Sequence, residues 1–349
     1  MKILLMVLLM AWTVVDQQTS LDQLILQGEE ALKEGVFRKS EEYLRIALAR
    51  ADSATDKLEK VRIQIDLTSL LMLSGRNVEA EEELQNALTA LRTNTDAGKS
   101  YLPIVLVNLG AVYIQTGQYK KSESALNEAK GILDRDPSNI RLQVDLLSNL
   151  GILYVMTGRG KAAQAVLEHA IAINAKGDNN PVYMARTLTN LAMLYHLQKK
   201  WNLAEPVLVR AQQVLEASLG PTPDLAAVLN NLGYVYEAQK KFSKAESVLR
   251  RALDIRTQSF GSQNLKVAAT EMNLAELLTE EGRFEEAQNL YSHALDVQER
   301  LSGPHSSDVA SILESLAKVL RLKIDQQAKE MEARAKAIRR EQALVRSVH

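Results

Sequence analysis

A phrase of Asn, then Leu, then Gly or Ala returns along this chain at intervals of 41 or 42 residues. Its asparagines are Asn108, Asn149, Asn190, Asn231 and Asn273. A fixed period of this length is the signature of a repeat protein, in which each repeat is one supersecondary unit and stacked neighbours bury a shared core. The sequence therefore predicts a stack of similar units, and not a globular core built from distant segments.

Each phrase is followed by a turn and by a second apolar pattern. In the clearest copy this part comprises Gly282, Phe284, Ala287, Tyr291, Ala294 and Leu295. Two earlier copies, around Gly28 and Leu67, keep the frame without the Asn, and an eighth begins at Leu316. We expect further glycines to follow the ends of helices, since Gly adopts the left-handed conformation at little cost. These are Gly177, Gly220, Gly261 and Gly303.

Both patterns indicate helices. The Leu, the small residue and the Tyr of the phrase lie on one stripe of a first helix, where the small residue lets a paired helix approach closely. The Ala and Leu residues of the second pattern supply the opposing face. Strong helix formers dominate the composition, and only 5% of the residues are aromatic. We therefore predict an all-α chain of about eight helix-turn-helix repeats.

The repeated residues resemble the tetratricopeptide motif. The period of 41 to 42 residues and the loop phrases, such as the one over 219–224, are similar to the kinesin light chain type of repeat. The resemblance covers about residues 21 to 340. It implies a right-handed alpha-solenoid that takes no cofactor and binds a protein or an extended peptide in its concave groove.

The solenoid is expected to span residues 21–322, and residues 323–349 are expected to form the last repeat helix and a charged C-terminal cap. This end carries seven basic and four acidic residues. A basic helix that binds nucleic acid or a membrane is the alternative. Because the acids are interspersed and no aromatic residue is present, the cap is favoured.

The N-terminus resembles a secretory signal peptide. Lys2 is followed by thirteen uncharged, mostly apolar residues, 3–15, and then by a polar stretch, which predicts a signal peptide over residues 1–20. Thirteen helical residues rise about 20 Å, less than the hydrocarbon core of a bilayer, so we expect no integral membrane span. The alternative is an apolar helix that caps the array. The first interpretation places the protein outside the cytoplasm, secreted or periplasmic, and the second leaves it in the cytoplasm.

Several classes of chemistry find no support in the sequence. With 42 Lys and Arg against 43 Asp and Glu, no net field attracts nucleic acid. There is no cysteine, and none of the five histidines belongs to a metal-binding pair. His169 and His293 occupy a repeat position where other copies carry charged residues, so both are expected on the solvated surface. No phosphate-binding loop occurs. We expect no metal, no cofactor and no enzymatic activity.

The asparagine series is the best candidate for a binding site. Asn is a mediocre helix former, so five copies at one register suggest a task for the amide. In proteins that this chain resembles, the same helix face lines the groove, and the asparagines hold the main chain of an extended peptide. Residues three positions further on would receive its side chains, among them Ile152, Met193 and Tyr234. The alternative is that each amide bonds to its neighbouring helix.

Charged residues on this face restrict the ligand. Among the central copies only Arg186 is basic, so a clamp for a C-terminal carboxylate is not expected. Glu237, with Glu276 and Glu280, makes an acidic stretch that predicts Lys or Arg in the ligand. The predicted function is a non-catalytic scaffold for proteins or peptides. The alternative is an architectural or self-assembly role through the convex face or the array ends, and neither the partner nor the oligomeric state follows from the sequence.

Overall fold

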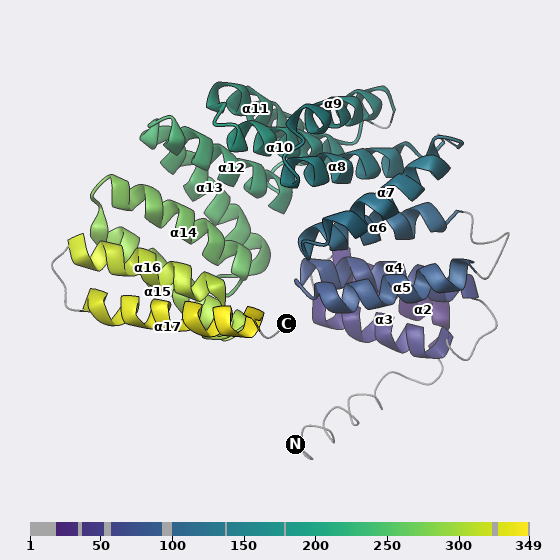
Figure 1. Ribbon diagram of the computed structural model, residues 1–349, viewed down its shortest axis with the longest axis horizontal. Coiled ribbons are helices and arrows are strands. Elements are labelled where there is room, and N and C mark those ends of the chain that lie inside the picture. Colours follow the sequence, from purple (N-terminus) through teal and green to yellow (C-terminus); the bar gives the residue numbers. More distant parts are fainter. Residues whose placement is uncertain are drawn as a thin grey trace, which may run out of the picture. The chain divides into compact units, whose positions relative to one another are not determined.

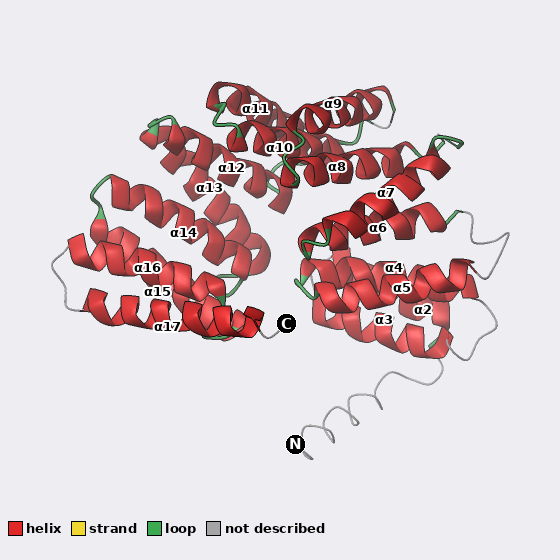
Figure 2. Cartoon of the chain, in the orientation of Figure 1, coloured by secondary structure: helices red, strands yellow, loops and turns green. Residues whose placement is uncertain are grey.

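The structure is a computed structural model that describes residues 19–33, 37–51, 57–92, 100–136, 138–177, 179–322 and 327–347. Within these ranges it consists of helices joined by turns, and no strand occurs (Figure 2). The all-α prediction is confirmed. The predicted signal peptide lies almost wholly outside the described residues. None of the helices in the described ranges is long and apolar enough to cross a membrane.

The chain divides into two compact units, Met1–Arg159 and Gly160–His349, which we call unit 1 and unit 2. The helices of unit 1 are α2 (Leu21–Lys33), α3 (Phe37–Ala51), α4 (Lys57–Leu73), α5 (Asn77–Arg92), α6 (Leu102–Gln115), α7 (Tyr119–Leu133) and α8 (Ile140–Met156). Those of unit 2 are α9 (Gly160–Lys176), α10 (Pro181–Leu197), α11 (Trp201–Ser218), α12 (Pro223–Ala238), α13 (Phe242–Phe260), α14 (Leu265–Glu280), α15 (Phe284–Ser302), α16 (Ser307–Leu322) and α17 (Gln327–Ser347).

Consecutive helices pack as pairs within each unit (Figure 1). In unit 1 the pairs are α2 with α3, α4 with α5 and α6 with α7, and α8 packs on α6 and α7. In unit 2 the pairs are α10 with α11, α12 with α13, α14 with α15 and α16 with α17, and α9 packs on α10. First helices of successive repeats also contact one another: α10 contacts α12, and α12 contacts α14. This is the helix-turn-helix stacking that the period predicts.

The small residue of the repeated phrase brings paired helices close together. A Cβ on Gly110 would lie 2.4 Å from a methyl carbon of Leu126, and one on Gly233 would lie 2.5 Å from Cγ of Leu249. Both leucines are fully buried. The hydroxyl of Ser122 donates to the carbonyl oxygen of Gly110 at 2.9 Å. Glycine at this register thus permits a contact distance that a larger side chain would prevent.

Glycines end the helices where the sequence predicts it. Gly261 and Gly303 follow α13 and α15 with φ angles of 76° and 85°. Gly220 lies two residues after the end of α11 and has a φ of 71°, and Gly177 directly follows α9. All four glycines lie at helix ends, as predicted. The left-handed conformation is found at Gly220, Gly261 and Gly303 but not at Gly177, and after α9 it is Asn179 that has a positive φ, of 45°.

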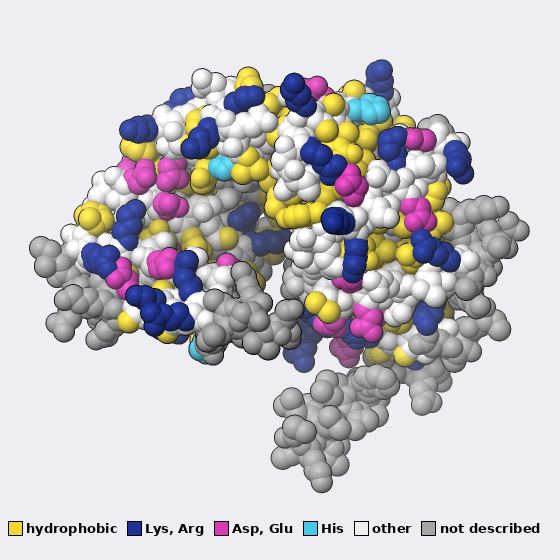
Figure 3. All heavy atoms as spheres, viewed as in Figure 1, with side chains coloured by type: hydrophobic (Ala, Val, Ile, Leu, Met, Phe, Trp, Pro, Cys, Tyr) yellow, Lys and Arg dark blue, Asp and Glu magenta, His cyan; other side chains and the backbone are white. Residues whose placement is uncertain are grey.

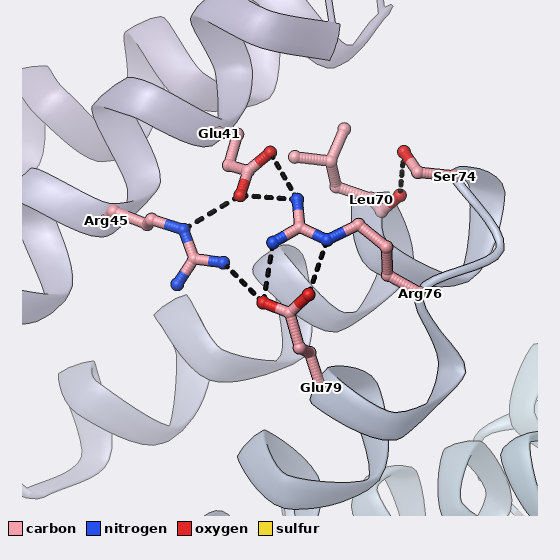
Figure 4. Close-up of polar contacts among 6 residues, drawn as sticks. All are labelled: Glu41, Arg45, Leu70, Ser74, Arg76 and Glu79. Atoms are coloured by element: carbon pink, nitrogen blue, oxygen red, sulfur yellow. Dashed lines mark hydrogen bonds and ion pairs between the residues drawn. The ribbon is translucent and has the colours of Figure 1, made fainter. Parts of the chain in front are cut away.

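Ion pairs join the second helices of successive repeats. In unit 1 the guanidinium of Arg76 lies between Glu41 of α3 and Glu79 of α5, at 2.7 Å and 2.5 Å (Figure 4). Arg45 bridges the same two carboxylates from the other side, at 2.8 Å and 3.0 Å. Unit 2 repeats this network with the equivalent residues Arg283, Glu246, Glu286 and Arg250.

The network belongs to a wider ladder of polar contacts. In each of these contacts, the residue just before the second helix of one repeat touches a Glu in the second helix of the preceding repeat. This Glu is the fifth residue of its helix. The pairs are Arg76 with Glu41, Gln118 with Glu81, Arg159 with Glu123, Lys241 with Glu205 and Arg283 with Glu246. These contacts tie each turn to the preceding repeat.

Candidate functional site

A pocket of about 320 Å³ opens between first helices of unit 2. Its lining comes from α10, α12 and α14, with one residue from α11; we call this surface the first-helix face. The lining residues are Thr189, Asn190, Ala192, Met193, His196, Leu208, Asn230, Asn231, Tyr234, Val235 and Asn273. The structure thus brings together five residues predicted from the sequence: Asn190, Asn231, Asn273, Met193 and Tyr234.

Two amides of the asparagine series bond to a neighbouring helix. Nδ2 of Asn273 donates to Oδ1 of Asn230 on α12 at 3.0 Å. In unit 1, Nδ2 of Asn149 donates to the carbonyl oxygen of Val107 on α6 at 3.3 Å. For these two positions the amide has a structural role, which is the alternative that the sequence left open.

Asn190 differs from these two. Its Nδ2 atom is buried in the pocket wall and has no hydrogen-bond partner in the described part of the chain. A buried amide group without a partner costs about 1 to 3 kcal/mol, and most native proteins avoid it. An acceptor such as a peptide carbonyl in the pocket would satisfy this donor.

The rings of His196 and Tyr234 line the pocket, and the ring of Trp201, which is not part of this lining, packs against His196. The ring of His196 contacts Tyr234 at a centroid distance of 4.6 Å and Trp201 at 4.9 Å, both edge to face. Tyr234 remains 44% exposed, so its ring can still meet a ligand. Burial lowers the pKa of His196, which favours the neutral ring. The sequence gave no reason to group His196 and Trp201 with Tyr234, because they come from the end of one first helix, the following second helix and the next repeat.

Acidic side chains follow the pocket toward the carboxyl ends of α12 and α14. Glu237 lies one turn after Tyr234, and Glu276 lies one turn after Asn273. Burial raises the pKa of Glu237 to about 7, and the charges of Glu276 and Glu280 add to the rise. Glu276 and Glu280 are therefore close enough for their charges to act on Glu237, which agrees with the predicted acidic stretch.

Arg186 lies at the opposite end of the pocket, one turn before Asn190 on α10. Its guanidinium sits 4.8 Å from the ring centroid of Tyr183. The side chain is accessible to solvent, yet the surrounding protein partly desolvates it and lowers its pKa, an effect that the charge of Asp224 opposes. The first-helix face of unit 2 thus runs from a basic end to an acidic end.

In unit 1 the predicted residues Asn108, Asn149 and Ile152 are partly buried on α6 and α8. Sequence reasoning missed Asp66, which occupies on α4 the register that Asn108 has on α6. Burial raises the pKa of Asp66 to about 6, helped by the charge of Glu29, and its Oδ2 atom is buried without a partner in the described residues. Aligning the two copies that lack Asn would have revealed an acid at this register.

One expectation for the histidines needs correction. His169 is exposed, as expected, but His293 is only 33% exposed. Its Nδ1 atom lies 2.8 Å from Oε2 of Glu271, a carboxylate that is buried on α14. The repeat position alone did not show that α14 supplies a buried partner. In the described residues, no group of three or more His, Cys, Asp or Glu could hold a metal ion.

Charges of both signs are interspersed on the surface seen in Figure 3. Dark blue Lys and Arg side chains and magenta Asp and Glu side chains alternate over the described parts of both units. On this face the mixture of signs agrees with the balanced composition of the chain.

Comparisons with known proteins identify the repeats. A family profile described as tetratricopeptide repeat matches residues 101–176, 183–258 and 266–341, together more than half of the chain. A search of curated proteins gave no match.

Solved structures with the same fold include BtubC (BKLC) from P. vanneervenii, with 22% identity and a TM-score of 0.59 over 65% of this chain and 92% of that one. A kinesin light chain-like protein from Podosopora anserina with nearly identical repeats has 21% identity and a TM-score of 0.50, over 59% and 97% of the chains. A tetratricopeptide repeat protein from Parabacteroides merdae has 16% identity and a TM-score of 0.53, over 85% and 98%. At these identities the likeness concerns the fold alone.

Proposed function

Because this chain belongs to the tetratricopeptide repeat family, whose members generally serve as scaffolds for protein interaction, we propose that its first-helix face in unit 2 binds an extended segment of a partner protein. The single observation that carries the proposal is the buried, unpaired Nδ2 atom of Asn190 in the wall of the pocket. A main-chain carbonyl of the ligand would accept a hydrogen bond from it. That bond removes the cost of the unpaired group only when the ligand is present.

The pocket suits one apolar or aromatic side chain of the ligand. Its volume of about 320 Å³ and its lining by Met193, Tyr234 and His196 provide a concave, largely apolar site with a few polar groups. Asn231 offers a second amide on the same face, with both an acceptor and a donor for the ligand's main chain.

The charges give the ligand a preferred composition. A Lys or Arg side chain beside Glu237, Glu276 and Glu280 would relieve the repulsion among the three carboxylates. At the other end, Arg186 would donate hydrogen bonds to a carboxylate or a carbonyl oxygen of the ligand. The proposed ligand is an extended segment with an apolar residue near its centre and a basic residue on one side.

Proteins of this family are typically non-catalytic, and we propose that this chain also acts by binding. The pocket lining includes one aliphatic hydroxyl, that of Thr189, and one imidazole, that of His196. The Thr189 hydroxyl donates to the carbonyl oxygen of Ala185 at 2.8 Å, and the His196 ring packs against Trp201 and Tyr234. Each group is thus engaged with other partners, which supports binding over nucleophilic catalysis.

The experiment is affinity capture with the full chain, followed by identification of the bound protein and mapping of the bound segment. The variant Met193→Glu places a charge in the pocket. Because Met193 is half-buried and accessible to solvent, the fold should persist. Loss of the captured protein with this variant supports binding at the first-helix face. Capture that Met193→Glu leaves intact, or a chain that retains only other copies of itself, would instead favour the architectural role.

We further propose that the protein is exported and that its N-terminal segment is removed. The supporting feature is the basic residue Lys2 followed by the uncharged, mostly apolar residues 3–15, which is the order of a signal peptide. Intact-mass measurement on the natural protein should show a chain that begins between about Val15 and Leu21. A soluble cytoplasmic protein that retains Met1 would refute the export proposal.

A further inference from the structure

Two adjacent turns of unit 2 carry lysine at a backbone position that strains it. Lys199 and Lys240 have φ angles of 55° and 59°. The equivalent turns of other repeats have glycine with positive φ: Gly75, Gly117, Gly158 and Gly282. Glycine adopts this conformation without strain, and a strained side chain that persists points to a function for that side chain. The helix dipole does not explain the choice, because Lys200 and Lys241 already place a cation at the same helix ends.

The ladder of contacts between repeats is interrupted at the first of these turns. Gln164 occupies on α9 the position that Glu205 occupies on α11, and an amide cannot neutralise Lys200. The amide of Gln164 instead donates to Glu168 on its own helix at 2.9 Å. At the second turn the ladder continues, since Lys241 pairs with Glu205 at 2.7 Å.

The two turns therefore form a surface with excess positive charge, which we call the lysine edge. It comprises Lys199, Lys200, Lys240, Lys241 and Lys244, all of which are exposed. Of these five lysines, Lys241 is the one that forms an ion pair with a carboxylate in the described part of the chain, and Lys244 shares the same Glu205 at longer range. At the turns of the networks described above, by contrast, Arg76 and Arg283 each contact more than one carboxylate.

A pocket of about 260 Å³ lies between the two turns. It is lined by Lys199, Lys200, Trp201, Asn202, Leu203 and Gln239. Leu203 is 47% exposed, which provides an apolar contact beside the lysines. The Oε1 atom of Gln239 is buried and has no hydrogen-bond partner within the described residues, while its Nε2 donates to Asn202 at 3.4 Å. The site thus offers an acceptor, an apolar surface and unneutralised cations.

We propose that the lysine edge binds an acidic, extended segment of a partner protein, at a site separate from the pocket on the first-helix face. The Asp or Glu side chains of this segment complement the lysines of the edge that have no carboxylate partner in the described part of the chain. A main-chain N–H of the segment donates to Oε1 of Gln239, and one apolar side chain contacts Leu203. A lipid phosphate has no proton to donate to this oxygen, so a protein segment fits the site better than a membrane surface.

The test uses the full chain and a fluorescein-labelled synthetic peptide in which one Leu is flanked by Glu residues, with a Gln counterpart. Fluorescence anisotropy should show binding of the Glu peptide that weakens with salt. The double variant Lys199→Gly, Lys240→Gly should weaken it about tenfold, equivalent to about 1.4 kcal/mol. Its melting temperature should stay the same or rise, because glycine relieves the backbone strain. Gln164→Glu should also weaken binding, since it gives Lys200 a carboxylate within the chain.

A matched control removes two exposed lysines elsewhere, Lys120→Ala with Lys318→Ala, and should leave binding intact. Asn190→Ala should leave it intact as well, which separates this site from the first-helix face. Equal binding of the Gln peptide, or equal affinity of the double glycine variant and the native chain, would overturn the proposal. So would a preference for phosphatidylserine vesicles or oligothymidylate over the Glu peptide.

Discussion

The absence of one methyl group sets the distance between paired helices at several points. Gly110 and Gly233 lie against fully buried leucines of the partner helix, and a Cβ at either position would overlap with them. Ala192 and Ala275 occupy the equivalent positions of α10 and α14. The fold therefore accepts a methyl group at this register when the packing of the helix pair leaves room for it. Each pair is therefore adapted to its own small residue.

Gly233→Ala is expected to destabilise the protein by about 1 to 3 kcal/mol, because Leu249 must move within a filled core. Gly131 lies within helix α7, where a Cβ would meet nothing within 4 Å. Gly131→Ala should therefore stabilise by up to about 1 kcal/mol through helix propensity. Denaturant unfolding of the two variants measures both effects. Equal effects of the two substitutions would contradict the close approach of α12 and α13.

The raised pKa of Glu237 predicts a dependence of stability on pH. The native state keeps a proton on Glu237 that the unfolded chain releases, since the pKa rises from 4.5 to about 7 on folding. The contribution of this group to stability is thus highest below pH 4.5, falls as the pH rises to about 7, and stays low above that. Glu237→Gln should stabilise the protein more at pH 8 than at pH 5, as thermal unfolding can show. A stabilisation independent of pH would indicate that Glu237 is solvated.

The sequence predicted the shared register of the asparagines in the proposed binding site but not their separate roles. Five amides share one register, yet Asn149 and Asn273 have protein partners, and Nδ2 of Asn190 has none among the residues that the structure describes. The difference depends on which groups of the preceding helix come within about 3 Å of each amide. The repeat pattern does not specify distances at that scale.

Helices of successive repeats are joined by ion pairs as well as by apolar contacts. The same four-residue network occurs once in each unit, around Arg76 in unit 1 and Arg283 in unit 2. Two of its acids, Glu79 and Glu286, lie in the first turns of α5 and α15, where a carboxylate also interacts favourably with the helix dipole. The contacts between repeats were not apparent, because Arg76 lies 35 residues from Glu41 and Arg283 lies 37 residues from Glu246, and these side chains become neighbours only when the repeats stack.

Arg76→Ala is expected to lower stability by about 1 kcal/mol, since exposed ion pairs contribute 0.2 to 1 kcal/mol each and Arg45 still holds both carboxylates. The loss should shrink in 1 M salt, where the Debye length is about 3 Å. Arg135→Ala removes the same charge from an exposed site and should have little effect. If both variants unfold alike at low salt, the network does not stabilise the repeat stack.

For the whole chain, the period of the sequence predicted most of the architecture. Eight copies of one apolar pattern predict helix pairs, their order and the glycines that end them, because each feature depends on neighbours in sequence. The proposed binding surface depends on side chains from three repeats of unit 2, and His196, Trp201 and Tyr234 were grouped only by the structure. Longer-range placement of side chains therefore limited the functional prediction more than the fold.

The central claim is that Asn190 holds a ligand whereas Asn149 and Asn273 hold neighbouring helices. Calorimetric titration of the captured segment and thermal unfolding, applied to Asn190→Ala and Asn273→Ala, test it most directly. Asn190→Ala should weaken binding by about 0.5 to 1.5 kcal/mol, or more if it leaves a ligand group unpaired, and should leave the melting temperature unchanged or slightly higher. Asn273→Ala should lower the melting temperature more than Asn190→Ala does. A sharp fall in the melting temperature of Asn190→Ala with binding intact would contradict the claim.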